Sequence, residues 1–308
     1  MSSEQQPFIK FKPGQEEAFW CELRIFFMLW RRQYGKSFTL GSRAMRRMMQ
    51  RKNHAVIFVS ASILLGSEWI RKEAEVWRIV MSKYREMLIA QGQQQLTTTA
   101  DDDNGNLLDV DAIADLFEHQ KLETRIYHNN VDYSRTQVVA PNPDTAVGWT
   151  GDVYLDEVAR IASLKDVFEA VMPFIDSNPQ FEMIMATTAP PDDSHDSFEL
   201  FLPPAQEWET NPRGNWYRSP SGIMVHRLDA WDGAAGGAVY YHPETGKVVT
   251  PEEHRATYFD KRSWDRNHGV KFITGGVSAV PLMALQNAME KGKDTCMGNY
   301  ITDEIKIA

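Results

Sequence analysis

The stretch Trp30-Arg31-Arg32-Gln33-Tyr34-Gly35-Lys36-Ser37 decides the fold, because it joins an apolar run to an amphipathic segment. The run Leu23 to Trp30 is interrupted only at Arg24 and predicts a buried strand. Residues Lys36 to Gln50 predict a helix. A glycine, a lysine and a serine between a strand and a helix favour a phosphate-binding loop, since N–H groups at a helix start point towards an anion.

The residues of this loop have separate chemical roles in that interpretation. Gly35 lets the backbone approach phosphate oxygens, Lys36 can reach the β- and γ-phosphates, and the Ser37 hydroxyl can hold Mg²⁺. The standard pattern has a glycine five residues before Gly35, where this chain has Trp30. Because Gly-Lys-Ser alone is common, the strand before it and the helix after it carry the prediction.

A second apolar strand, expected at Val153 to Leu155, is followed by the adjacent carboxylates of Asp156 and Glu157. In a P-loop ATPase the first acid would hold the magnesium shell and the second would polarise the attacking water. Acids are also favourable where a strand meets a helix N-terminus, which is a purely structural alternative. The loop upstream in the same chain favours the catalytic interpretation.

A third strand, expected at Phe181 to Ala186, is followed by Thr187 and Thr188. Hydroxyl groups beside the acidic strand could sense the γ-phosphate and relay its loss. Ordinary capping of a strand end is the alternative for this pair.

Apolar runs alternate with amphipathic segments through the first half of the chain, which is typical of a mainly parallel sheet flanked by helices. We expect an α/β P-loop NTPase core of the ASCE type over residues 1–205. After Pro203, Trp, Gly and Pro become frequent and periodicity weakens, so residues 206–308 predict a small, irregular lid or linker subdomain. Further strands are expected at Ala55–Ser60, Glu123–His128 and Gln137–Ala140, and further helices at Gln15–Cys21, Ser67–Ala90, Val110–His119, Pro251–Ser263 and Val280–Lys291.

The net charge of −9 argues against a protein that coats nucleic acid over its whole surface. Only Cys21 and Cys296 occur, without metal-type spacing, which fits a reducing cytoplasm. No apolar run approaches the roughly 18–20 residues that span a bilayer, so no membrane is expected. One basic cluster at helical spacing could form a DNA patch or a solvated helix face: Arg43, Arg46, Arg47, Arg51 and Lys52.

These elements together resemble the large-terminase family of tailed bacteriophages. The family's phosphate loop, Ser-Arg-Gln-x-Gly-Lys-Ser, is matched by Arg31 to Ser37, with Arg31 in place of the serine. Thr187-Thr188-Ala189-Pro190 is similar to its coupling motif, and Gln15 is similar to its adenine-reading glutamine. The resemblance covers about residues 8–205 well and is looser to about residue 295.

The resemblance implies an ATP-hydrolysing, Mg²⁺-dependent motor that translocates double-stranded DNA into a procapsid in the host cytoplasm. It implies a portal protein and a small terminase subunit as partners, and a homo-oligomeric ring formed only on docking to the procapsid. The implied catalytic residues are Glu157 and Arg32, the coupling residues are Thr187 and Thr188, and Ser37 and Asp156 hold the metal. The implied ATP-binding residues are Gln15, Arg31, Arg32, Gln33, Gly35, Lys36 and Ser37.

The missing nuclease and one departure from the family's motifs shape the expected activity. Complete terminases continue into a nuclease that gathers carboxylates around metal, and nothing similar precedes Ala308, so we expect no nuclease activity in this chain. The family usually has an arginine before the glycine at Gly148, where this chain has Val147. The positive charge opposite the transferred phosphoryl group must then come from elsewhere, and the candidates are Arg32 first, then Arg135 and Arg160.

Two other functions share this core. A helicase or other nucleic-acid-dependent ATPase should carry a second motor domain, and residues 206–308 are too short for one. A non-hydrolysing nucleotide-binding scaffold would have no need of a base at Glu157.

Overall fold

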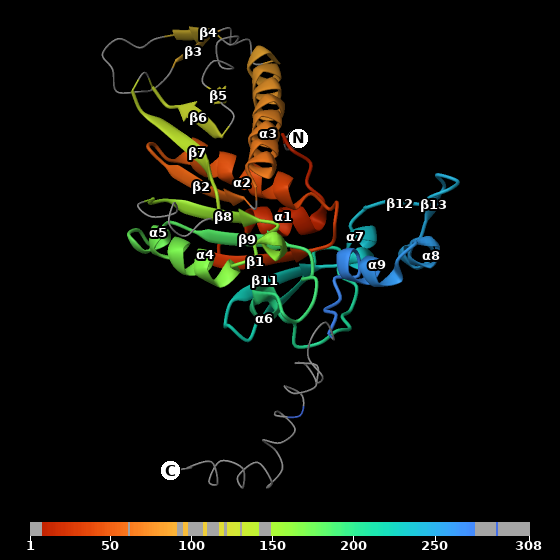
Figure 1. The fold of residues 1–308 in the computed structure, drawn as a ribbon. Helices are drawn as coiled ribbons and strands as arrows, with labels where there is room; N and C mark the ends of the chain where they lie inside the picture. The colour runs from red at the N-terminus through yellow and green to blue at the C-terminus, as the bar shows by residue number, and fades with distance from the viewer. Residues whose placement is uncertain are drawn as a thin grey trace, which may run out of the picture.

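A computed structural model describes residues 8–60, 62–90, 95–97, 107–109, 117–119, 122–129, 131–141, 149–274 and 288. Its central feature is a nine-stranded sheet of order β10-β11-β1-β9-β8-β2-β7-β6-β5 (Figure 1). The bounds of these strands are β1 Ile25–Trp30, β2 Ala55–Ser60, β5 Phe117–His119, β6 Glu123–Tyr127, β7 Tyr133–Val139, β8 Asp152–Asp156, β9 Met183–Thr187, β10 Asn215–Arg218 and β11 Met224–Leu228.

The strands from β11 to β7 in this order all run parallel, and β10, β6 and β5 are antiparallel to their neighbours. Smaller pairs form β3 Gln95–Thr97 with β4 Leu107–Asp109, and β12 Tyr240–Tyr241 with β13 Val248–Val249. The expected mainly parallel sheet flanked by helices is therefore confirmed. Among the described helices, none is long and apolar enough to cross a membrane.

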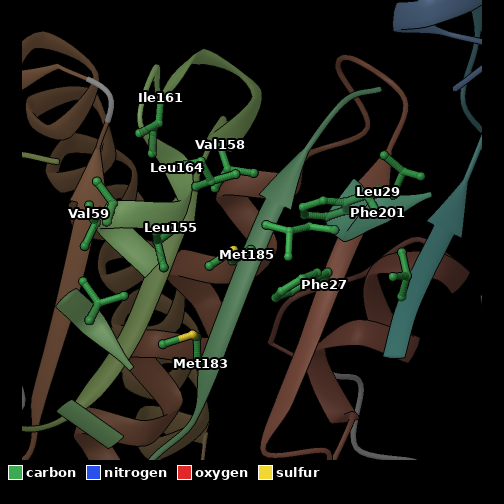
Figure 2. Packing of buried hydrophobic residues seen from close by; sticks show 14 of the residues in the cluster. Phe27, Leu29, Val59, Leu155, Val158, Ile161, Leu164, Met183, Met185 and Phe201 are labelled. Carbon is green, nitrogen blue, oxygen red and sulfur yellow. The ribbon is translucent and has the colours of Figure 1, made fainter. Parts of the chain in front are cut away.

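Alternate residues of the parallel strands face opposite layers of helices, as the twofold period of a strand requires. Phe26 and Phe58 contribute to the core beneath α1 Pro13–Trp20, α2 Lys36–Gln50 and α3 Ile63–Ala90. Phe27, Leu155 and Met185 contribute to the core on the other face, shown in Figure 2. The helices of that face are α4 Leu164–Val171, α5 Pro173–Asp176 and α6 Asp196–Phe201.

The observed elements agree with most of those predicted in the first half of the chain. Both α2 and β2 have the predicted bounds, and α3 begins four residues earlier than predicted. The helix predicted at Val110–His119 is wrong at Phe117–His119, because these residues form β5 and pair with β6. Its remaining residues lie outside the described ones, as does the helix predicted at Val280–Lys291 except for position 288.

The region after residue 205 contributes to the main sheet before it forms a separate unit. β10 and β11 extend the sheet next to β1, and the sheet therefore continues to Leu228. Figure 1 shows the elements after β11 grouped to one side of the sheet. We propose that the lid or linker subdomain begins after β11. Its elements are α7 Ala230–Ala235, the β12–β13 pair, α8 Pro251–Thr257 and α9 Lys261–Asn267.

The predicted basic cluster on α2 is not a solvated face at Arg43 and Arg47. Arg43 donates to both carboxylate oxygens of Glu182 at 2.7 Å, and Arg47 donates to Asp152 through Nη2 at 2.8 Å. Burial opposes ionisation of Asp152, but hydrogen bonds from His54 and Arg47 lower its pKa below the ordinary value. These ion pairs are buried and join α2 to the amino ends of β8 and β9, so neither arginine is available to DNA.

Candidate active site

The order of the strands brings three predicted motifs together at the carboxyl ends of the parallel strands. β9 lies between β1 and β8, and all three strands are parallel. Leu29 of β1 is paired with Thr187, and Asp156 of β8 is paired with Ala186. The phosphate loop, the two threonines and the acidic pair therefore follow the carboxyl ends of adjacent strands, where ligands bind in open α/β sheets.

Gly35 has a conformation that the loop requires. Its φ of 95° lies in the left-handed region, and a Cβ there would meet the Gln15 side-chain nitrogen at 2.5 Å. Helix α2 begins at the next residue, and the Gly35 carbonyl accepts from both the N–H and the hydroxyl of Thr39, at 2.9 and 3.0 Å. The glycine thus allows the close approach between α1 and the start of α2.

Lys36 is buried at the first position of α2. Its ammonium donates to the carbonyl of Trp30 at 3.5 Å, so the side chain folds back over the loop. Burial lowers the pKa of Lys36, while Glu157 and Asp156 act to raise it. A buried ammonium facing two carboxylates, with the loop around it, is suited to binding a polyanion.

Ser37 and Asp156 make the contact that joins the loop to the acidic strand. The Ser37 hydroxyl donates to Asp156 Oδ2 at 2.5 Å. Burial, and then the neighbouring charge of Glu157, raise the pKa of Asp156. A cation at these oxygens would stabilise the ionised form of Asp156. Mg²⁺ prefers one or two carboxylates together with water and phosphate oxygens. The pair therefore fits Mg²⁺.

Glu157 has an unusual backbone conformation immediately after Asp156. Its φ of 53° lies in the left-handed region, which costs a non-glycine residue about 1–3 kcal/mol. Its N–H donates to Asp156 Oδ1 at 2.9 Å. The Glu157 carboxylate is partly exposed and lies 3.9 Å from Arg160 Nε. The two acids thus occupy different environments, one buried and one open to water.

Thr187 and Thr188 are both buried at this edge. The Thr187 hydroxyl accepts from the N–H of Ala159 at 3.2 Å. Ala159 belongs to the short helix η2 Val158–Arg160, which follows Glu157 directly. The threonine predicted to couple hydrolysis to movement is therefore hydrogen-bonded to the turn that carries the predicted base.

The first half of the loop is hydrogen-bonded to β11 and to α9. The N–H of Arg31 donates to Leu228 and the N–H of Arg32 donates to Asn267, both at 2.7 Å. The Arg31 guanidinium is buried 4.4 Å from the centroid of the Tyr240 ring, and burial lowers its pKa. The side chains of Arg32 and Gln33 are exposed.

Two other predicted residues occupy distinct places. Gln15 is buried beside Gly35, and its Oε1 accepts from the N–H of Lys12 at 3.0 Å. Arg135 pairs with Ala55 at the start of β2, whereas Asp156 pairs with Ser60 at its end. Arg135 therefore lies at the amino ends of the parallel strands and Asp156 at their carboxyl ends. Because β7 runs parallel to β2, Arg135 lies near the beginning of β7, and its role as a source of positive charge stays a prediction.

A pocket of about 130 Å³ opens beside the Ser37–Asp156 contact. Glu157 also lines it, and one wall comes from the beginning of α3. This wall could not be recognised from the sequence, because a helical stripe with a spacing of three and four residues is ordinarily core. The residues of the wall are Leu65, Glu68, Trp69 and Lys72.

No protein-family model matches the chain, and no curated protein matches its sequence. Among solved structures, a mutant of the Thermus phage P74-26 large-terminase ATPase domain is similar over 84% of this chain and 93% of its own, with 16% identity and a TM-score of 0.55. Another structure of that ATPase domain has the same coverage, with 17% identity and a TM-score of 0.52. The large terminase of a thermophilic bacteriophage in complex with ADP matches over 86% of this chain and 54% of its own, with 10% identity and a TM-score of 0.48. The chain therefore has the fold of a phage large-terminase ATPase domain, which is a P-loop NTPase fold.

Proposed function

We propose that this chain is the ATP-hydrolysing motor of viral DNA packaging, which translocates double-stranded DNA into a procapsid. The observation that carries the proposal is the hydrogen bond between Ser37 and Asp156. It joins a loop suited to phosphate with an acid suited to Mg²⁺, and Glu157 follows that acid directly. The fold shared with large-terminase ATPase domains supports the same function.

The residues of the chain divide the chemistry among them. Lys36 and the first N–H groups of α2 would bind the phosphates, and Ser37 and Asp156 would hold the metal. When bound, Mg²⁺ would neutralise charge on the phosphate oxygens. Glu157, which is partly open to water, would orient the attacking water and accept its proton.

The coupling step would begin at the turn after Glu157. Loss of the γ-phosphate would release Glu157, and the hydrogen bond from Ala159 to Thr187 would carry that change to β9. We further propose the partners that such a motor needs: the portal protein, a small terminase subunit, and neighbouring copies of this chain in a ring formed on the procapsid. The site of action would be the host cytoplasm.

The test is ATP turnover with and without Mg²⁺. Lys36→Ala should abolish turnover, and Glu157→Gln should lower kcat at least about a hundredfold, the scale of a general base. Glu157→Gln should still bind ATP, because Asp156 remains. Lys165→Ala is the matched control, since Lys165 is exposed and pairs with exposed Glu199. Parent-like turnover by Glu157→Gln would show that Glu157 is not the base.

Packaging itself needs a second measurement. Purified procapsids carrying portal protein should protect double-stranded DNA from nuclease digestion when the parent chain and ATP are present. Glu157→Gln should give no protected DNA. If the parent hydrolyses ATP but protects no more DNA than Glu157→Gln does, the chain is an ATPase and not a packaging motor.

A further inference from the structure

Helix α3 supplies a wall of the active-site pocket that the chemistry above does not use. Glu68, Trp69 and Lys72 line this pocket together with Ser37, Asp156 and Glu157. Ser60, at the end of β2, is paired with Asp156 and also lines the pocket. The beginning of α3 therefore faces the same space as the residues proposed for metal binding and proton transfer.

The orientation of this wall is fixed by packing. The Trp69 ring stacks on Phe58 of β2, with 3.9 Å between ring centroids and 14° between ring planes. Helical side chains lean towards the N-terminus of their helix. Because α3 starts just after the carboxyl end of β2, the Lys72 side chain leans towards the edge that carries Asp156.

The charges on the wall single out Lys72. Glu68 pairs with Arg71, whose side chain is 76% exposed, so that carboxylate already has a cationic partner. Within the part of the chain that the structure describes, Lys72 has no ion pair. Its ammonium is thus left to serve the pocket, where Asp156 and Glu157 would otherwise repel an incoming phosphate.

We propose that Lys72 is a further catalytic residue, which contacts the transferred phosphoryl group from the α3 side of the pocket. This inference rests on the proposed ATPase function. In the step, the bond from the water oxygen to the γ-phosphorus forms and the bond from that phosphorus to the bridging oxygen breaks. Glu157 takes the water proton, the electron pair leaves with ADP, and Lys72 keeps its proton throughout. Its charge would stabilise the phosphoryl oxygens most in the transition state.

The experiment compares Lys72→Met with Lys72→Arg and with Arg78→Met, an exposed cation on the same helix. Steady-state kcat is measured, together with equilibrium affinity for Mg²⁺–ADP and for Mg²⁺–ADP–aluminium fluoride, a mimic of the phosphoryl transition state. Lys72→Met should lower kcat about 10²–10³-fold, the scale for losing one preorganised charge donor. Affinity for the aluminium fluoride complex should fall by a similar factor, affinity for ADP should not change, and Lys72→Arg should recover part of both.

The outcomes separate the inference from the function on which it rests. A parent chain that neither binds nor hydrolyses ATP contradicts the proposed function. A parent that hydrolyses ATP while Lys72→Met matches Arg78→Met overturns the role of Lys72. Equal losses of affinity for ADP and for the aluminium fluoride complex also overturn it, because they show uniform binding. If thermal melting shows that Lys72→Met is unfolded, Lys72→Gln takes its place with the same expected results.

Discussion

The Arg31 guanidinium lies 4.4 Å from the centroid of the Tyr240 ring, and this contact packs the first residue of the phosphate loop against the unit that follows β11. Gly233 of α7 allows the approach, because a Cβ there would meet Arg31 Cδ at 2.8 Å. The backbone hydrogen bond from Arg31 to Leu228 attaches the same residue to β11 of the main sheet. Arg31 therefore anchors the loop, and the nucleotide contact that the family resemblance implies for it stays a prediction.

The first prediction concerns this anchor. Arg31→Ala and Tyr240→Ala should each lower the free energy of unfolding, and the double variant should lose less than the sum. A coupling energy of about 1–2 kcal/mol is expected for a buried cation–π contact. Urea unfolding of the single and double variants measures it, with Tyr241→Ala as the control because Tyr241 is 57% exposed. Additive losses would show that the two side chains do not interact.

The second prediction concerns the buried ion pairs behind the loop. Arg47→Met removes a cationic partner from the buried Asp152 carboxylate. It should therefore lower the free energy of unfolding by about 3–5 kcal/mol. Arg51→Met removes an exposed bond to the Gln180 carbonyl and should cost far less. Because Arg47 is buried, Arg47→Met should have the same DNA affinity as the parent chain under native conditions. A selective loss of DNA binding by Arg47→Met would restore the basic-patch interpretation.

The third prediction is a dependence of stability on pH. Burial raises the pKa of Glu73 to about 7, although the hydroxyls of Thr124 and Thr136 donate to it at 2.7 and 2.8 Å. An acid whose pKa is raised by folding binds its proton more tightly in the folded state. Its stabilising contribution is therefore complete below the unfolded value of about 4.5 and is lost as pH rises through about 7.

Glu73→Gln tests this dependence, because glutamine has a similar shape and does not titrate. Between about pH 4.5 and pH 7, the unfolding free energy of the parent should fall relative to that of Glu73→Gln. Above this range the difference should be constant. Glu75→Gln is the control, since Glu75 is exposed on the same helix. Parallel curves for the parent and Glu73→Gln would mean that folding does not raise the pKa of Glu73.

The sequence predicted the parallel core because its signals are local. The run of Ala55–Ser60 is apolar and short, and the helix Lys36–Gln50 follows a loop whose glycine must adopt a positive φ. Asp156 and Ser37 are 119 residues apart, but their meeting follows from two strand ends at one edge of a parallel sheet. The contact between Ser37 and Asp156 could therefore be predicted once the order and direction of the strands were inferred.

The sheet strands after residue 205 could not be predicted in the same way. β11 contains His226 and Arg227, two polar residues that argue against a buried strand. His226 is fully buried, and both of its ring nitrogens have hydrogen-bond partners there. The Trp30 indole donates to Nδ1 at 3.1 Å, and Nε2 donates to the Arg213 carbonyl at 2.7 Å. Burial lowers the pKa of His226 to about 4, so it stays neutral. These partners are distant in sequence, and no local pattern shows them.

The last prediction concerns the source of the arginine charge, since Val147 occupies the position where the family resemblance implies an arginine. Arg32 is exposed in the loop, and its backbone is held by Asn267. Arg160 is 53% exposed and lies 3.9 Å from the Glu157 carboxylate, within the same turn. An arginine against the transferred phosphoryl group contributes roughly 10³–10⁵ in rate, so losing the right one should be evident in kcat.

A mixing experiment separates action within a subunit from action on a neighbour. Each arginine-to-alanine variant is mixed with Glu157→Gln on procapsids, and ATP turnover is measured, with exposed Arg262→Ala as the control. An arginine that acts on the neighbouring subunit is supplied by the Glu157→Gln copies, so turnover returns in the mixture. We expect Arg32→Ala to be inactive alone and in the mixture, because its loop is anchored within its own subunit at Leu228 and Asn267. Near-normal turnover by Arg32→Ala alone would contradict this assignment, and recovery of Arg160→Ala only in the mixture would assign the charge to Arg160 of a neighbouring subunit.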